Sequence, residues 1–193
     1  MKKTIGIFIL TLLISLSISA QRDQTLFSEG GIRLTGAWGG PFVAGTLVDG
    51  NVVRQSGGMF GLEFNKNLFL GWGGNSVDYP SIDGASIDFS YSGLVLNYMP
   101  SAHKVIHPSF GILGGGGNFG ASVATNKQKS DVWVGQPFAG VEFNLFRWMR
   151  VGLSAGYRFA FFVGEEFNGV DSNDLSAPYG ALTFKFGFSW GND

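Results

Sequence analysis

The stretch that decides the fold reads Y-G-A-L-T-F-K-F-G-F-S-W and spans Tyr179–Trp190. Its large apolar side chains recur at every second position, with small or polar side chains between them. A period of two indicates a β-strand, because successive side chains of a strand point to opposite faces. The large face is mostly aromatic, so this strand must lie against an apolar surface. That surface is a core in a soluble protein and lipid in a transmembrane barrel.

The first twenty residues have the features of a secretory signal peptide. Two lysines follow Met1, an apolar run covers Ile5–Ile18, and small residues close the segment at Ala20. The run is shorter than the ~20 apolar residues of a spanning helix, so a cleaved signal is favoured over a permanent anchor. We expect residues 1–20 to be a signal peptide for the general secretory pathway and residues 21–193 to form one barrel domain.

The composition excludes several classes of protein. There is no cysteine, which excludes a disulfide framework, thiol catalysis and a lipid-anchored lipoprotein. The formal net charge of −1 is not basic enough for a nucleic-acid partner. Glycine, at 31 of 193 residues, and phenylalanine, at 19, are both abundant, and dense glycine disfavours helices. A membrane-embedded form of this chain must therefore be a closed barrel.

Eight segments show strand-like alternation. They cover residues 30–39, 56–64, 67–76, 86–98, 108–117, 131–145, 148–161 and 179–190. In the fourth segment the apolar positions change from odd to even numbers, which predicts a bulge at Ser92–Gly93. Pro137 lies inside the sixth segment and cannot donate a ladder hydrogen bond, so we expect a bulge or a local break there.

The connections between these segments alternate in length. Short turns are expected around residues 65–66, 101–103 and 146–147, and longer polar loops near residues 41–54, 77–85, 118–130 and 162–177. An even strand count with short periplasmic turns and long extracellular loops is typical of barrels of the Gram-negative outer membrane. The sequence predicts an all-β protein, an eight-stranded antiparallel transmembrane up-and-down β-barrel. The alternative is a soluble sandwich or lipocalin-like barrel with its apolar faces inside.

An outward aromatic face turns charged side chains inward, where they must be paired. We expect a structural ionic network of Arg33, Glu63, Glu142, Arg158 and Lys185, with Asp88 as a candidate third carboxylate. Such a network would plug the narrow interior of an eight-stranded barrel.

The amphipathic rings of tryptophan favour membrane–water interfaces. We expect interface aromatics at Trp38, Trp72, Trp148 and Trp190. The last two would lie near the periplasmic side, and the first two toward the other rim.

Patterns that would carry chemistry are sparse. The two histidines, His103 and His107, lie in the expected turn before the fifth strand, and no third metal ligand is evident. Gly114–Gly117 is not followed by the Lys-Ser/Thr of a phosphate-binding loop, so close strand packing is the better explanation. The acidic stretch at residues 165–174 is a solvated loop or, less favoured, a divalent-cation site. We expect no catalytic residue, no cofactor and no resident metal.

Several blocks resemble small outer-membrane β-barrel proteins common in Bacteroidota. The blocks are Gly58–Phe64, Leu70–Gly74, Gln136–Pro137 with Val141–Asn144, Arg150–Gly152 with Gly156–Phe159, and Leu182–Gly187. The resemblance implies the fold and an outer-membrane localisation. It implies no biochemical function, because the family is largely uncharacterised. The position of Gln136 is often acidic in such relatives.

These observations favour a non-enzymatic outer-membrane protein with a structural or interaction role. The alternatives are a small-solute channel and a lipid-modifying enzyme. The expected partners are outer-membrane lipid and lipopolysaccharide, a larger outer-membrane complex, and the barrel-assembly machinery. The aromatic end at Phe188–Trp190 resembles the C-terminal signal that this machinery recognises.

Overall fold

The computed structural model describes residues 31–48, 50–79, 86–123, 126–163 and 172–190. The predicted signal peptide and most of the acidic loop lie outside these residues. Residues from Leu34 onward form one compact unit. No helix in the described part of the chain is long and apolar enough to cross a membrane.

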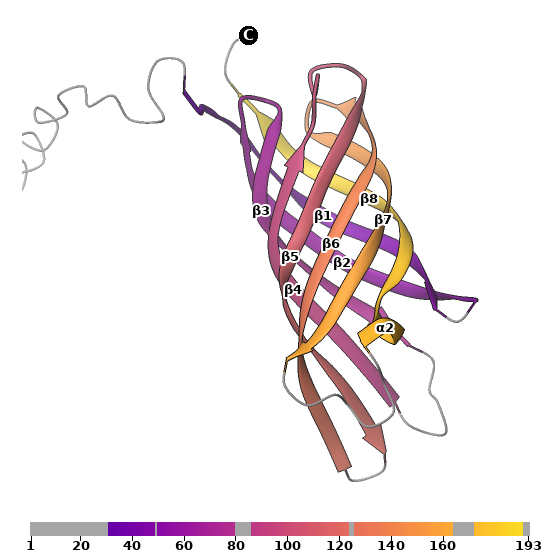
Figure 1. Cartoon of the computed structure of the whole chain (residues 1–193). Coiled ribbons are helices and arrows are strands. Elements are labelled where there is room, and N and C mark those ends of the chain that lie inside the picture. The colour runs from indigo at the N-terminus through magenta and orange to yellow at the C-terminus, as the bar shows by residue number, and fades with distance from the viewer. Residues whose placement is uncertain (1–30, 49, 80–85, 124–125, 164–171, 191–193) are drawn as a thin grey trace, which may run out of the picture. The chain divides into compact units, whose positions relative to one another are not determined.

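The compact unit is a closed barrel of eight antiparallel strands, each paired with its neighbours in the chain, and β1 pairs with β8 to close it (Figure 1). The strands are β1 (Leu34–Val48), β2 (Asn51–Phe64), β3 (Leu68–Asp78), β4 (Ser86–Tyr98), β5 (Ile106–Val123), β6 (Asn126–Phe146), β7 (Met149–Val163) and β8 (Ala177–Ser189). The one described helix, α2 (Ser172–Leu175), packs against β7. The predicted fold class is confirmed.

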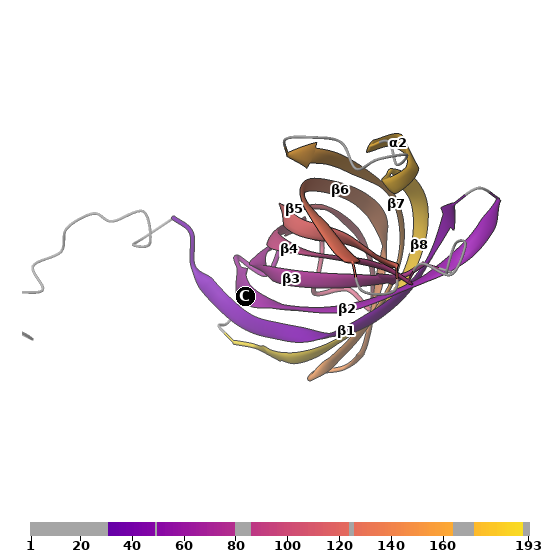
Figure 2. The ribbon, with the colours of Figure 1, turned by 90° about the horizontal axis from the view of Figure 1, so that it is seen from below.

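The register of the strands defines how steeply they wind around the barrel. A path through paired residues that leaves β1 at Gly36 returns to β1 at Thr46, a shear of ten residues. With ~4.8 Å between strands and ~3.3 Å per residue, this shear tilts the strands by about 40°. That tilt lies within the range of outer-membrane barrels. Figure 2 looks along the barrel and shows the strands enclosing its interior.

The connections fall into two sets, at opposite ends of the barrel. The turn end carries the β2–β3, β4–β5 and β6–β7 connections, and the loop end carries the other four. Two predicted loops are instead paired strand, because the ladders continue to Val48↔Asn51 and to Val123↔Asn126. Residues 41–48 and 51–54 are therefore paired arms of one hairpin and residues 118–123 and 126–130 those of another, and β5–β6 is the longer of the two (Figure 1).

The two predicted irregularities have different outcomes. The prediction of a bulge at Ser92–Gly93 is wrong, because β4 pairs with β3 and β5 in an unbroken register through both residues. At Pro137 the ladder to β7 lacks the pairs of Gln136 and Pro137 but resumes at Phe138 in the same register. Proline has no N–H to donate, so the predicted local break is present without a bulge.

The four consecutive glycines of β5 alternate in their surroundings. A Cβ atom on Gly115 would lie 2.1 Å from the Ser92 carbonyl oxygen, and one on Gly117 would lie 2.3 Å from the Ser90 oxygen. Gly114, in contrast, has nothing within 4 Å. Every second glycine thus permits close approach of β4, as close strand packing requires.

The outer wall of the barrel is apolar over much of its area. Large apolar side chains stand exposed on every strand, among them Leu62, Leu70, Leu96, Phe110, Val141, Leu153, Phe186 and Phe188. A soluble barrel would bury such side chains, and an apolar outer wall around a polar interior is the arrangement of a barrel in lipid. The lipocalin-like alternative is therefore excluded.

Candidate functional site

Most of the predicted ionic network lies inside the barrel. Glu63, Glu142, Arg158 and Lys185 are each exposed by 4% or less. Arg33 differs from the prediction, since it precedes β1 and its side chain is exposed. The reason is position: the first pair of β1 is Leu34 with Phe64, so Arg33 lies before the strand.

Asp88, the candidate third carboxylate, is also placed differently. Its side chain is exposed, whereas its neighbour Phe89 is 1% exposed and points inward. Because β4 has no bulge, odd-numbered residues face the interior along the whole strand.

The first ion pair joins Glu63 on β2 to Arg150 on β7. The Arg150 Nη1 atom donates to Glu63 Oε2 at 2.6 Å. Ser189 donates to the other carboxylate oxygen at 2.6 Å and accepts from Arg150 Nη2 at 3.1 Å. Both carboxylate oxygens are therefore hydrogen-bonded, as a buried charge requires.

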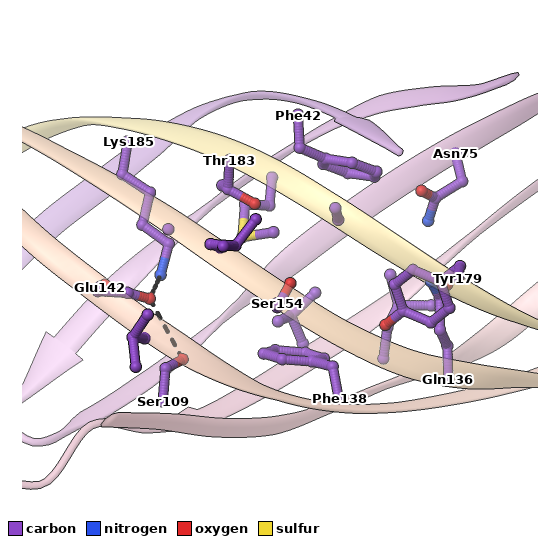
Figure 3. A pocket seen from close by; sticks show the side chains of 17 residues that line it. Phe42, Asn75, Ser109, Gln136, Phe138, Glu142, Ser154, Tyr179, Thr183 and Lys185 are labelled. Carbon is purple, nitrogen blue, oxygen red and sulfur yellow. Dashed lines mark hydrogen bonds and ion pairs between the residues drawn. The ribbon is translucent and has the colours of Figure 1, made fainter. Parts of the chain in front are cut away.

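The second ion pair joins Glu142 on β6 to Lys185 on β8. The Lys185 Nζ atom donates to Glu142 Oε1. The same oxygen accepts from Ser109 Oγ and from Asn97 Nδ2, both at 3.3 Å. Figure 3 shows the contacts of Lys185 and Ser109 with Glu142.

His107 completes this cluster, although the sequence placed it in a turn. It is the second residue of β5 and is 1% exposed. Its Nδ1 atom lies 3.2 Å from the Lys104 carbonyl oxygen, which can only accept, so Nδ1 carries the proton. Its Nε2 atom faces Glu142 Oε2 at 3.7 Å. We call Glu63, His107, Glu142, Arg150 and Lys185 the turn-end cluster.

Sequence reasoning left two members, His107 and Arg150, out of the network. The available signal was parity: His107 shares its inward parity with Ser109 and Leu113, and Arg150 shares its own with Arg158. His103, the other histidine, is exposed in the β4–β5 turn as expected.

Arg158 forms a separate network, with neutral hydrogen-bond partners, nearer the loop end. Its guanidinium donates to Gln55 Oε1 at 3.2 Å, to the Tyr79 hydroxyl at 3.1 Å and to the Leu175 carbonyl oxygen at 2.8 Å. Gln55 also donates to the Tyr91 hydroxyl at 3.1 Å, and Tyr91 donates to Gln136 at 2.6 Å. The single ionic network predicted from the sequence is thus divided into two groups.

Three of the four predicted interface tryptophans lie on the outer wall, and the fourth lies inside the barrel. Trp72, Trp148 and Trp190 are 46–47% exposed on the outer wall. The prediction for Trp38 is wrong: this residue is 4% exposed and points inward, beyond the register shift of β1. Its ring lies 3.9 Å from the Arg150 guanidinium carbon, and its Nε1 atom donates to Ser189 at 3.2 Å.

A cavity of about 50 Å³ separates the turn-end cluster from the Arg158 network. In Figure 3, Glu142 and Lys185 lie at one end, Asn75 and Gln136 at the other, and Phe138 between them. Drug-sized ligand sites measure roughly 300–1,000 Å³, so this volume suits a few water molecules.

An apolar layer crosses the barrel between the Arg158 network and the loop end. Its side chains are each exposed by 5% or less, and they are Val53, Val77, Phe89, Phe119, Val132 and Leu175. The rings of Phe89 and Phe119 meet edge to face at 6.3 Å. Described side chains thus fill the interior at both ends of the cavity.

The interior offers little chemistry beyond charge pairing. Ser109 donates to Asn97 at 2.9 Å and to Glu142, whose carboxylate is held by Lys185, whereas the base that activates a serine must be free to take its proton. In the described ranges, no group of three or more His, Cys, Asp or Glu side chains is placed to hold a metal ion.

Comparison with known proteins places the fold. No protein-family model matches the chain, and no curated protein matches it in sequence. The crystal structure of Neisserial surface protein A matches with a TM-score of 0.57 and 13% identity, covering 83% of this chain and 99% of that one. Ail, the attachment invasion locus protein of Yersinia pestis, matches with a TM-score of 0.50 and 13% identity, covering 82% and 100%. This chain therefore has the fold of small outer-membrane β-barrel proteins.

Proposed function

We propose that this chain is a non-enzymatic integral protein of the bacterial outer membrane with a structural or interaction role at the cell surface. The observation that carries the proposal is the inversion of a soluble barrel, with an apolar outer wall around a paired, filled interior. In this proposal residues 1–20 direct export through the secretory pathway, and the source is a member of the Bacteroidota.

The filled interior favours this role over that of a small-solute channel. A channel needs a continuous polar lumen, whereas the apolar layer at Phe89 and Phe119 crosses this one. A lipid-modifying enzyme needs a nucleophile in contact with a base that is free to take its proton, and the carboxylate that Ser109 contacts is paired with Lys185.

The proposed partners act on the outside of the barrel. Lipid and lipopolysaccharide would contact the apolar wall, and surface partners or a larger outer-membrane complex would contact the loop end. The aromatic end of β8 at Phe188–Trp190 would contact the barrel-assembly machinery during insertion. Crosslinking in intact cells followed by mass spectrometry would identify such partners.

Heat-modifiable gel mobility tests the membrane barrel. Protein extracted in mild detergent should migrate faster before boiling than after it, because a closed barrel remains compact in detergent until heat unfolds it. A mobility that boiling leaves unchanged, together with recovery of the protein in the soluble periplasmic fraction, would contradict the proposal.

A further inference from the structure

The outward side chains of the middle strands change character halfway along the barrel. On β3, Trp72 is followed toward the loop end by Ser76 and Asp78, both exposed. On β4, Leu94 gives way in the same direction to Ser90, also exposed. The same change follows Phe60 on β2, where the outward residues are Gly58, Ser56 and Arg54, before the exposed Val52 near the end of the hairpin. After Ile112 on β5 the outward residues are Gly114, Gly116 and Asn118.

The inward side chains of these strands are apolar nearest the loop end, at Val53, Val77 and Phe89. Nearer the turn end they are mixed, with polar Glu63 and Asn97 beside apolar Phe69 and Val95. Polar-out and apolar-in is the pattern of a sheet that faces water, whereas a lipid-facing strand has the reverse. Strands β2–β5 therefore pass from a lipid pattern to a water pattern along their own length.

The other side of the barrel keeps apolar side chains outside at the same level. Trp133 on β6, Phe159 and Phe161 on β7 and Leu47 on β1 are 44–62% exposed. On β7 the outward apolar side chains run from Met149 to Val163.

The register allows the two sides to be compared at one level. Ser90 pairs with Asn118, Asn118 pairs with Asp131, and Trp133 lies two residues from Asp131 toward the turn end. A shear of ten residues over eight strands means that each pair, taken from β4 to β5 to β6, lies about 1.25 residues closer to the loop end along the barrel axis. The two steps and the two residues back to Trp133 nearly cancel, so Ser90 and Trp133 lie at the same level to within about one residue.

The apolar wall is much taller on β7 than on β3. At ~2.5 Å of axial rise per residue, the outward apolar run is about 35 Å tall on β7 and about 10 Å tall on β3, from Leu68 to Trp72. Outer-membrane barrels carry an apolar band about 25 Å tall.

A tilt of the whole barrel does not account for this difference, because a tilt would displace both boundaries of the band. At the turn end the apolar wall begins at a similar level on β5 and β8, marked by Ile106 and Phe188. On β4 it begins higher: Tyr98 pairs with Phe110 and Phe110 with Ala139, so Tyr98 lies about four to five residues closer to the loop end than Phe146. The two boundaries of the band on β4 are thus displaced toward each other, which a tilt does not produce.

We propose that this barrel thins the loop-end leaflet locally along β2–β5. The hydrocarbon boundary lies near Trp72 and Leu94 on this side and near Trp133 and Phe161 on the other. The loop-end halves of β2–β5 then face water and lipid headgroups. The inference rests on the membrane insertion that the proposed function includes.

Single nitroxide labels on the full chain test this arrangement, since the sequence contains no cysteine to remove. Ser90→Cys, Leu94→Cys and Trp133→Cys would be labelled and refolded into phosphatidylcholine vesicles with a hydrocarbon core ~30 Å thick. Power saturation with a water-soluble nickel chelate and with oxygen measures the exposure of each label to water and to lipid. We expect the nickel-to-oxygen ratio at residue 90 to exceed that at residue 133 severalfold, with residue 94 resembling residue 133.

The other outcomes separate the inference from the proposed function. Equal ratios indicating lipid at residues 90, 94 and 133 would overturn the inference and leave membrane insertion intact. A label at residue 90 that neither reagent reaches would also overturn it, in favour of a second copy of the chain packed against β2–β5. Water-exposed labels at both residues 94 and 133 in folded protein would contradict both the inference and membrane insertion.

Discussion

At the residue scale, both carboxylates buried in the described part of the barrel are paired with a cation of their own. Glu63 is paired with Arg150 and Glu142 with Lys185. Ser189 donates to the second oxygen of Glu63, and His107 Nε2 faces that of Glu142 at 3.7 Å. Removing one partner of a buried pair costs more than the pair contributes, because the remaining charge stays buried without compensation.

Glu142→Gln should lower the free energy of unfolding by about 3–5 kcal/mol, since Lys185 loses its carboxylate inside the barrel. The change should not create ion conductance, because the apolar layer is untouched. The temperature at which heat-modifiable mobility is lost measures the effect. Asp88→Asn, which changes an exposed carboxylate, is the matched control. An unchanged transition temperature for Glu142→Gln would contradict a role for the ion pair in stability.

Trp38→Ala should cost about 3–5 kcal/mol of stability, as other buried aromatic truncations do. The substitution removes the ring that covers Arg150 and the hydrogen bond to Ser189. Trp72→Ala removes the same side chain from the outer wall and should cost less. Urea unfolding in lipid vesicles compares the two variants. Equal losses would indicate that Trp38 does not stabilise the turn-end cluster.

The sequence could predict which residues face inward wherever a strand alternates without interruption. Glu63, Glu142, Arg158 and Lys185 were predicted to face inward on this basis. It could not predict the face of Trp38, because a register shift leaves no unique trace in a glycine-rich segment. Nor could it predict that β1 begins only after Arg33. The sequence also could not predict which cation pairs with which carboxylate, such as Arg150 with Glu63. That pairing depends on the shear of the closed barrel, which the pattern of a single strand does not reveal.

At the scale of the element, β4 shows how an alternating pattern can be misinterpreted. The switch from Phe89 and Tyr91 to Leu94 and Leu96 indicated a bulge, on the assumption that apolar residues keep to one face. In the structure the backbone register is unbroken, and apolar side chains face inward at Phe89 and Tyr91 but outward at Leu94 and Leu96. A strand that is part lipid-facing and part water-facing produces this pattern without any irregularity.

Glycine packing between β4 and β5 makes a prediction at this scale. A Cβ on Gly93 would lie 2.1 Å from the Gly114 carbonyl oxygen, so Gly93→Ala should force the strands apart and reduce the yield of folded, heat-modifiable barrel. Gly135→Ala is the matched control, since nothing lies within 4 Å of its added Cβ. Equal folding yields would contradict the requirement for close approach at Gly93.

At the scale of the whole molecule, the filled interior predicts a closed barrel. Purified wild-type protein in planar bilayers should show no conductance above the lipid background, because ions would have to cross the layer that contains Phe89 and Phe119. Single-channel recording at high salt measures this. Stepwise conductance in wild-type protein, removed by extraction of the protein from the bilayer, would favour the channel alternative.

The pairing of Glu63 with Arg150 has a consequence for how the molecule folds. These residues lie on β2 and β7, and the pair spans the seam where β8 meets β1. An open sheet, with the seam unformed, leaves both charges without each other. The two charges are paired only when β8 pairs with β1. A partly closed barrel, with the seam still open, is therefore destabilised by the unpaired charges, and we expect closure to be cooperative.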